Sequence, residues 1–308
     1  MEQQPDGLDR ADKRKPLAEA ASLVQDRMVV AIGGFNTANK PMALIREIIK
    51  RGVRDLTVVA GPASMDIDLL IAAGCVKKVV VPYVGMEVLA PVGPFFRQAA
   101  QAGQIEVGEV DAGIVLTMLK AARQGLPFLP WRGGVGTSLP ELNPDLKIMQ
   151  CPFTGQQLLA VPAVSPDVAL IHAARSDPYG NVQHLGDSFA DALIAHASKL
   201  RIVQVEEIVA NEEIRRTHDQ TSIPSIFVDV VVHAPYGAHP VFSQKHYIID
   251  KQHIREYLGA AKAYLEGDKG PFERYMNKYV YSPQTNEDYL AQVGIGKLLD
   301  LRAQENYV

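Results

Sequence analysis

The stretch DRMVVAIGGFNTANKP, residues 26–41, decides the fold of this chain. Positions 28–32 are apolar without interruption, which is typical of a strand buried on both faces. Gly33 and Gly34 follow, and Pro41 stands near the first turn of a helix-length segment, where proline is favoured. The order of strand, glycine turn and helix predicts one unit of a mostly parallel sheet.

The same unit repeats along the chain. Further strands are predicted at residues 55–60, 78–81, 105–107, 167–172, 201–205 and 227–232, and helices at 41–50, 66–73, 95–102, 113–124 and 191–200. Val, Ile and Leu dominate the strands, so we expect an open α/β sheet with helices on both faces. No segment between residues 20 and 245 resembles a linker, so residues 17–308 are predicted to form a single domain with one extended core.

The two ends of the chain differ from this pattern. Residues 1–16 carry eight charges and few apolar groups, which predicts a flexible N-terminal tail. Residues 251–303 form a polar, helical C-terminal extension, and the breakers Gly270-Pro271 and Ser282-Pro283 predict several short helices there. No apolar run approaches the ~20 residues that cross a bilayer, so we expect no membrane partner and a cytoplasmic location.

Composition excludes some classes of function. The formal net charge is −4 and the sequence pI is near 6.1, which gives no electrostatic reason to expect nucleic acid as a partner. Cys75 and Cys151 lack a visible activating neighbour and are interpreted as buried thiols of a reduced compartment. Without an HExxH motif or carboxylate cluster, we predict neither a metal nor a permanently bound cofactor.

Ligands of open α/β sheets bind beyond the carboxyl ends of the strands, so the loops there are the candidate sites. Gly33 and Gly34 would let backbone N–H groups approach a ligand, although a tight structural turn is equally consistent with them. Ser64 follows the second strand and is either a hydroxyl donor to a ligand or a helix N-cap. Gly134 belongs to a third glycine-rich loop, residues 133–138, which either contacts substrate or is a mobile connection.

The sequence offers no convincing nucleophile. It contains no GxSxG elbow, and His172, His233 and His239 are interpreted as core, strand-end or turn residues rather than catalysts. The acidic pairs at 206–207 and 212–213 are interpreted as solvated helix ends. Glu109 and Asp111 lie beside a short strand, where one of them could present an acid to a cleft.

Residues 26–41 resemble the α-subunit signature of family I CoA transferases. The matching features are Asp26, the apolar run, the triplet Gly-Gly-Phe ending at Phe35, and Pro41 six residues later. Arg27 and Asn39 depart from the signature. Further similarity lies in residues 82–85, 125–130 and 166–173, and residues 206–240 resemble glutaconate CoA transferases in particular. The similarity covers roughly residues 18–300.

This resemblance implies an α subunit whose nucleophilic glutamate is supplied by a β subunit, in an α2β2 or higher heteromer. A carboxylate would attack a CoA thioester, and a second, dicarboxylic or other carboxylic acid would receive the CoA. Gly33, Gly34, Phe35, Ser64 and Gly134 would contact substrate from this chain, with no catalytic residue of its own.

Two alternatives stay open. Family transferases tend to carry a glutamine where this chain has Ala112, and ring-opening hydrolases an acid, so a CoA-thioester hydrolase or decarboxylase on the same heteromer is the second hypothesis. Glu109 or Asp111 would be its acid. The third hypothesis is a non-catalytic ligand-sensing domain. The sequence shows no helix-turn-helix or basic arm, which disfavours a sensing domain of a transcription regulator.

Overall fold

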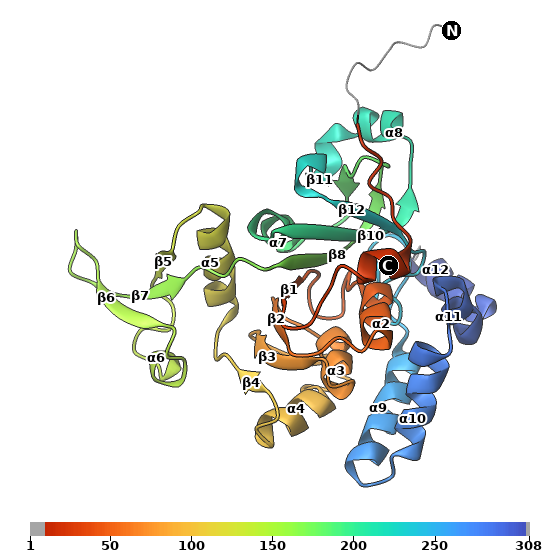
Figure 1. Cartoon of the computed structure of the whole chain (residues 1–308), viewed down its shortest axis with the longest axis horizontal. Helices are drawn as coiled ribbons and strands as arrows, with labels where there is room; N and C mark the ends of the chain where they lie inside the picture. Colours follow the sequence, from red (N-terminus) through yellow and green to blue (C-terminus); the bar gives the residue numbers. More distant parts are fainter. Residues whose placement is uncertain (1–9, 306–308) are drawn as a thin grey trace, which may run out of the picture.

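The computed structural model describes residues 10–305. In this part of the chain the main sheet has nine strands, and its parallel part runs in the order β12-β10-β8-β1-β2-β3-β4 (Figure 1). The bounds are β1 Val29–Ile32, β2 Leu56–Ala60, β3 Val76–Val80, β4 Glu106–Val107, β8 Val168–Ser176, β10 Leu200–Ile208 and β12 Val230–His233. The predicted open, mostly parallel α/β sheet is confirmed.

Side chains alternate along the strands between two apolar cores. In β1, Val30 and Ile32 enter one core and Ala31 the other, and Val58 and Val59 of β2 divide in the same way. The first core is covered by α1 Leu17–Ala21, α2 Met42–Lys50, α3 Met65–Ala72, α4 Pro94–Gln101 and C-terminal helices, and the second by α5 Ala112–Arg123 and α7 Asp191–Ala197. Burial of both faces explains why the strands are almost continuously apolar.

Residues 128–162 form an arm that the sequence patterns did not predict. Its strands β5 Phe128–Trp131, β7 Gln157–Pro162 and β6 Lys147–Gln150 make a separate antiparallel sheet, with α6 Leu139–Leu142 between β5 and β6. Figure 1 shows the arm at the left, beyond α5. Prolines at 130 and 162 obscured the strands, because proline is unusual inside a sheet.

The N-terminal segment is not loose throughout. Residues 1–9 lie outside the described range, but Lys13 and Lys15 hydrogen-bond through their backbones to Val231 of β12. The Lys13 ammonium also donates to the carbonyl oxygens of Ser225, at 2.6 Å, and Val228, at 2.8 Å. The prediction of a flexible tail is therefore wrong for residues 13–16. Their backbone groups form hydrogen bonds with the edge strand β12, whose N–H and C=O groups would otherwise lack partners on that side.

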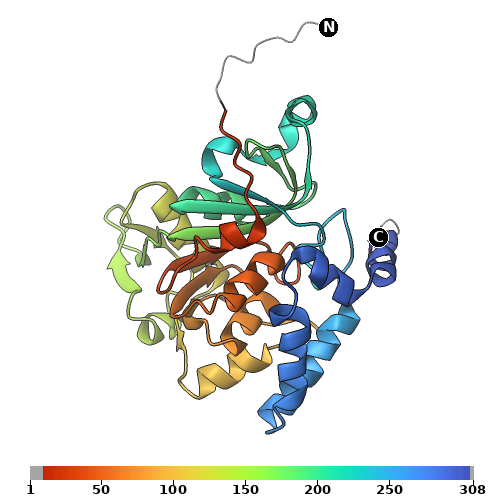
Figure 2. The same cartoon turned by 45° about the vertical axis from the view of Figure 1, so that its right-hand side comes forward.

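The C-terminal extension consists of several short helices, as predicted. They are α9 Lys251–Leu265, α10 Gly270–Met276, the π-helical turn η3 Asn277–Tyr281, α11 Asn286–Val293 and α12 Ile295–Glu305, and Figure 2 shows them side by side against the main body. The remaining elements are β9 Val182–Gln183, α8 Asn211–Arg216, η1 His218–Gln220, β11 Thr221–Ile223 and η2 Ser225–Phe227. Within residues 10–305, no helix combines the length and the apolar character needed to span a bilayer.

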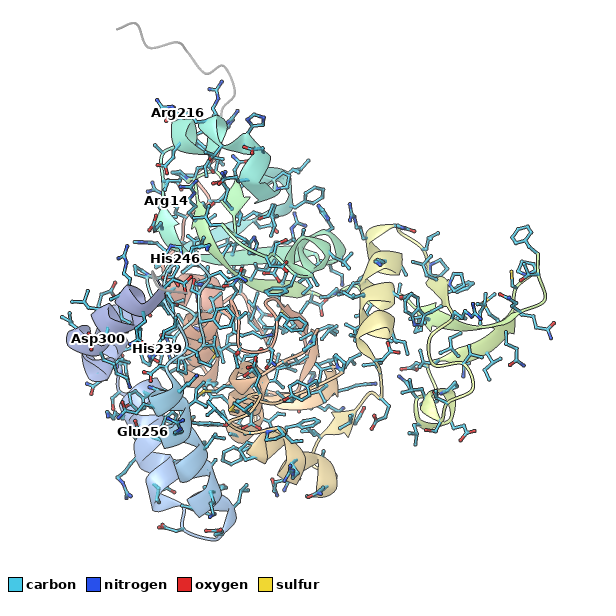
Figure 3. The ribbon with its side chains drawn as sticks, turned by 180° about the vertical axis from the view of Figure 1, so that it is seen from behind. Arg14, Arg216, His239, His246, Glu256 and Asp300 are labelled. Atoms are coloured by element: carbon cyan, nitrogen blue, oxygen red, sulfur yellow. The ribbon has the colours of Figure 1, made fainter. Side chains whose placement is uncertain are left out.

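A buried polar cluster attaches this extension to the sheet. The potential ligand atoms of His239, Asp250 and His253 all lie within 4.8 Å of one another, a spacing that a metal ion could use. Figure 3 labels His239 at the base of the C-terminal helices. Each residue already has protein partners: Lys297 at 2.7 Å from Asp250, Tyr289 at 2.6 Å from His239 and Tyr275 at 2.8 Å from His253. Because a lysine already neutralises the carboxylate, we interpret the cluster as a structural anchor.

Asp68 should give stability a distinct pH dependence. It lies buried under α9, where it accepts hydrogen bonds from the Tyr257 hydroxyl at 2.6 Å and the Phe96 N–H at 2.8 Å. Burial raises the pKa of Asp68 to about 6, so its contribution to stability is present below pH 3.8 and is lost as the pH rises through 6.

The variant Asp68→Asn removes this titration and keeps an acceptor. Relative to the native chain, it should gain up to about 3 kcal/mol of unfolding free energy between pH 4 and pH 7. Urea unfolding of both proteins at four pH values in this range measures the difference. A difference that does not change with pH would contradict the assignment.

Candidate functional site

Two loops meet at the carboxyl ends of β1 and β2. Because β1 and β2 are parallel neighbours, the loop at residues 33–41 lies beside the loop at residues 61–64. The Asn36 N–H donates to the Pro62 carbonyl at 2.7 Å, which joins the two loops directly. The structure thus brings Gly33, Gly34 and Phe35 next to the segment that contains Ser64.

Lys40 connects the two loops from the interior of the protein. Its side chain is fully buried, and its ammonium lies 3.1 Å from the Gly33 carbonyl oxygen, 3.3 Å from that of Pro62 and 3.4 Å from the Asp66 carboxylate. A buried lysine requires such partners, because an unpaired charge in the interior is costly. Nothing in the sequence marks Lys40 for this role, since a lysine in a loop is ordinarily a solvated residue.

The backbone donors of Gly33 and Gly34 are already used within the protein. The Gly33 N–H donates to the Leu170 carbonyl at 2.9 Å, and the Gly34 N–H donates to the Asp191 carboxylate at 2.7 Å. The two glycines therefore shape the loop instead of offering these N–H groups to a ligand in this conformation. Gly34 has a φ of +75°, which only glycine adopts readily. Phe35 is 44% exposed and stacks on Phe189 with ring centroids 5.0 Å apart.

Ser64 stands at the N-terminus of α3, but its hydroxyl does not cap the helix. The Ser64 N–H donates to Asp66 at 2.7 Å, and the fully buried Ser64 hydroxyl has no hydrogen-bond partner among the described residues. The Asn36 side-chain oxygen of the adjacent loop is likewise buried without a partner in that range. Since buried polar groups are normally paired, a water molecule or a ligand group that reached these two atoms would satisfy them.

The other predicted site residues lie near the base of the arm. Gly134 has a φ of +82°, and a Cβ there would be 3.1 Å from Leu159 of β7. Asp111 is the N-cap of α5, and its carboxylate accepts the Ile114 N–H at 2.7 Å. This carboxylate therefore has a structural role in starting the helix. Glu109 and Ala112 are exposed.

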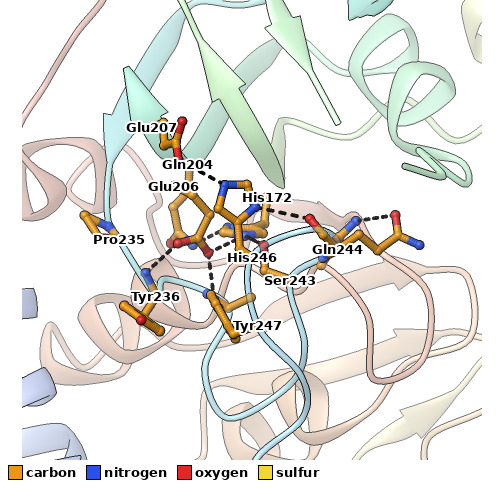
Figure 4. A network of polar contacts seen from close by, with 12 residues as sticks. His172, Gln204, Glu206, Glu207, Pro235, Tyr236, Ser243, Gln244, His246 and Tyr247 are labelled. Atoms are coloured by element: carbon orange, nitrogen blue, oxygen red, sulfur yellow. Dashed lines mark hydrogen bonds and ion pairs between the residues drawn. The ribbon is translucent and has the colours of Figure 1, made fainter. Parts of the chain in front are cut away.

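A second polar network connects β8 and β10 to the loop at residues 236–247 (Figure 4). The buried Glu206 carboxylate accepts from the Tyr247 hydroxyl at 2.7 Å and the Tyr236 N–H at 2.6 Å, and it lies 3.0 Å from His172 Nε2. Burial opposes ionisation of Glu206, but the hydrogen bonds from His172 and Tyr247 hold its pKa below the usual value.

The interpretation of residues 206–207 as a solvated helix end is wrong for Glu206, which is buried in a strand, whereas Glu207 is half exposed. The core interpretation of His172 is confirmed. The Leu44 N–H donates to the Gln204 side-chain oxygen at 3.1 Å, so the Gln204 amide nitrogen donates to His172 Nδ1 at 2.7 Å. His172 Nε2 therefore carries the proton that faces Glu206.

The two cysteines occupy different environments. Cys75 is buried, and burial raises the pKa of its thiol to about 11, as expected for an inert core residue. Cys151 is only half buried, in the turn between β6 and β7, so its prediction as a buried thiol is wrong. A hydrogen bond with Thr154 lowers the pKa of the Cys151 thiol.

Together these features define an α/β protein with a candidate ligand site at two loops joined by a buried lysine. The model of the family described as Coenzyme A transferase matches residues 14–234. The chain belongs to the coenzyme A transferase family, and the resemblance seen in the sequence is confirmed.

Individual relatives cover most of the chain. A glutaconate CoA-transferase subunit from Acidaminococcus fermentans is 34% identical over 89% of each chain, and the crystal structure of that enzyme superposes with a TM-score of 0.88 over 94% of this chain and 95% of that one. The cholesterol ring-cleaving hydrolase IpdA subunit of Mycobacterium tuberculosis is 34% identical over 92% of this chain and 97% of its own length. An uncharacterized protein of Archaeoglobus fulgidus is 39% identical over 94% of this chain, which spans only 64% of that protein.

Proposed function

We propose that this chain is the α subunit of a heteromeric, cytoplasmic CoA transferase that moves CoA between a thioester and a carboxylic acid. The similarity of fold and sequence to a subunit of glutaconate CoA-transferase over most of both chains supports this proposal. A dicarboxylic acid is proposed as one of the two acids that are exchanged, and because the exchange is reversible its own CoA thioester can serve as the donor.

The β subunit would supply the glutamate, whose carboxylate attacks the donor thioester to form a mixed anhydride and release CoA as a thiolate. The thiolate then attacks the glutamyl carbonyl of the anhydride, which frees the donor acid as a carboxylate and leaves CoA on the glutamate as a thioester. The acceptor carboxylate passes through the same two steps in reverse and leaves as the new CoA thioester.

The α chain would then form the acid-binding side of the site. Phe35 presents an exposed ring, and within the two joined loops the buried Ser64 hydroxyl and Asn36 side-chain oxygen have unused hydrogen-bonding capacity. Gly33 and Gly34 would contribute by letting the loop turn sharply. Such preorganised groups contribute most where charge develops in the transition state.

A transfer assay distinguishes this function from hydrolysis. The α chain, co-purified with its β subunit, is incubated with glutaryl-CoA in the presence and absence of acetate as acceptor. We expect acetyl-CoA to form only with acetate, and rates at least about 10³-fold lower for the α chain alone, because the nucleophile is missing. CoA release that does not depend on acetate would instead support a hydrolase of the CoA thioester.

The arm offers an apolar surface that we assign to the β subunit. Phe128, Pro130, Leu158, Ala160 and Pro162 point to one face of its sheet, as the register of β5 and β7 shows, and Phe128 is 41% exposed. The opposite face packs on α5, so both faces are apolar, whereas an antiparallel sheet in water normally has one polar face. Relatives that are named as subunits of larger enzymes make the β subunit the proposed occupant.

The variant Phe128→Asp should weaken assembly with the β subunit about 30-fold or more, because an aromatic side chain that the β subunit would cover is replaced by a charge. Lys147→Glu, on the same face and exposed, tests the surface without touching the core. Size-exclusion chromatography of co-expressed subunits measures the effect. Ile226→Asp, at a 73% exposed site in η2, is the control and should leave assembly intact. Full assembly of both arm variants would contradict the assignment.

A further inference from the structure

The segment at residues 184–191 lies over the end of β1. Ile32 pairs with Leu170 of β8, and β1 ends there. Farther along β8, the antiparallel strand β9 pairs with Arg175 and Ser176. The chain that leaves β9 therefore runs back along β8 toward Leu170 and arrives above the loop that begins at Gly33.

Two contacts from the segment at residues 184–191 hold the loop that begins at Gly33. Asp191 accepts the Gly34 N–H at 2.7 Å, and the Phe189 ring stacks on Phe35 at an interplanar angle of 19°. The fit is close, because a Cβ at Gly33 would lie 2.6 Å from the Asp191 carboxylate oxygen. This contact gives a physical reason for glycine at position 33.

The carboxylate of Asp191 is fully buried and is paired with His184. His184 Nε2 lies 3.0 Å from the second Asp191 oxygen, and His184 Nδ1 lies 2.6 Å from the Ser222 hydroxyl. The order Ser-His-Asp is that of a hydrolytic triad, but here the aspartate faces the substrate loop and the serine lies at the far end, in β11. The geometry suits support of a loop and not attack on a substrate.

We propose that Asp191, held by His184 and Ser222, is a positioning residue that fixes the Gly33–Phe35 loop in its substrate-binding shape. The inference rests on the proposed function, since it assumes that this loop contacts the acid. Asp191 acts through Gly34 and does not touch the substrate itself. Its loss leaves the buried Gly34 N–H without an acceptor and frees the peptide to rotate.

Three variants of the heteromer test this role. Asp191→Ala should lower kcat/KM for the carboxylic acid about 10- to 100-fold, as expected for a misplaced substrate loop, with a smaller change in KM for the CoA thioester. Asp191→Asn keeps an oxygen acceptor for Gly34 and should stay within about threefold of the native enzyme, because a neutral histidine accepts as well as donates. The kcat/KM of His184→Ala for the carboxylic acid should lie between the values of these two variants.

Asp167→Ala is the matched control. Asp167 also accepts a backbone N–H of β1, that of Val29 at 2.9 Å, but at the opposite end of the strand. This control should lower stability without the selective loss of kcat/KM for the acid.

Amide hydrogen exchange supplies a readout that does not depend on activity. Asp191→Ala should speed exchange in a peptide covering residues 33–38, whereas Asp191→Asn and Asp167→Ala should not. Unchanged exchange in Asp191→Ala, or equal kinetic losses in Asp191→Ala and Asp167→Ala, would overturn the inference. If the native heteromer transfers no CoA, the proposed function fails, and hydrogen exchange alone still decides whether Asp191 fixes the loop.

Discussion

The variant Gly34→Ala is expected to lose at least about 100-fold in kcat/KM for CoA transfer, because the substrate loop cannot keep its shape. Gly34 has a φ of +75°, and a Cβ there would lie 2.3 Å from the Ala38 carbonyl oxygen and 2.5 Å from that of Asn39. Both obstacles are backbone atoms, so the loop has to move. We expect a loss of about 2–4 kcal/mol in the free energy of unfolding, from backbone strain and steric overlap together.

Gly52→Ala separates these two causes. Gly52 follows α2, outside the candidate loops, and has a similar φ of +68°, but a Cβ there would have no neighbour within 4 Å. It should therefore show the cost of strain alone, about 1–2 kcal/mol, with little change in transfer. Urea unfolding and the acetate-dependent assay measure both variants. Equal stability and equal activity of the two variants would show that the close packing around Gly34 has no functional importance.

The variant Lys40→Met is expected to destabilise the protein by about 3–5 kcal/mol, because it leaves the buried Asp66 carboxylate without a cation. Lys40 and Asp66 are both fully buried, and their charged atoms lie 3.4 Å apart. The same change removes a donor from the carbonyl oxygens of Gly33 and Pro62, so the two loops should also separate. Chemical denaturation gives the stability, and the transfer assay gives the functional consequence.

A double-mutant cycle identifies the charge as the cause. Asp66→Asn keeps an acceptor for the Ser64 N–H but removes the negative charge, so the double variant should be more stable than Lys40→Met alone. Lys199→Met is the surface control: its ammonium lies 2.8 Å from Asp167 but is 69% exposed, and its loss should cost less than about 1 kcal/mol. Additive effects of the two buried changes would show that Lys40 and Asp66 do not depend on each other.

Local patterns predicted the repeating elements because hydrophobic periodicity and glycine placement act over a few residues. The strand before Gly33, the helix after Pro41 and the breaks at Gly270-Pro271 and Ser282-Pro283 all follow from such patterns. The arm was missed because its strands are short and contain Pro130 and Pro162. Glu206 was misplaced because adjacent acids ordinarily indicate a solvated surface, whereas hydrogen bonds from distant partners offset the cost of its burial here.

By itself, the sequence determined an open α/β sheet, the family and the loop at Gly33–Phe35, because these depend on side-chain order within single elements. Only the tertiary structure decided that the N–H of Gly34 is bound by Asp191, 157 residues away, and that Lys40 reaches across to Asp66. Such contacts depend on which strands are neighbours and on their register. Hydrophobic patterns within one strand do not specify its neighbours, so folding of the whole sheet is what brings these charges together.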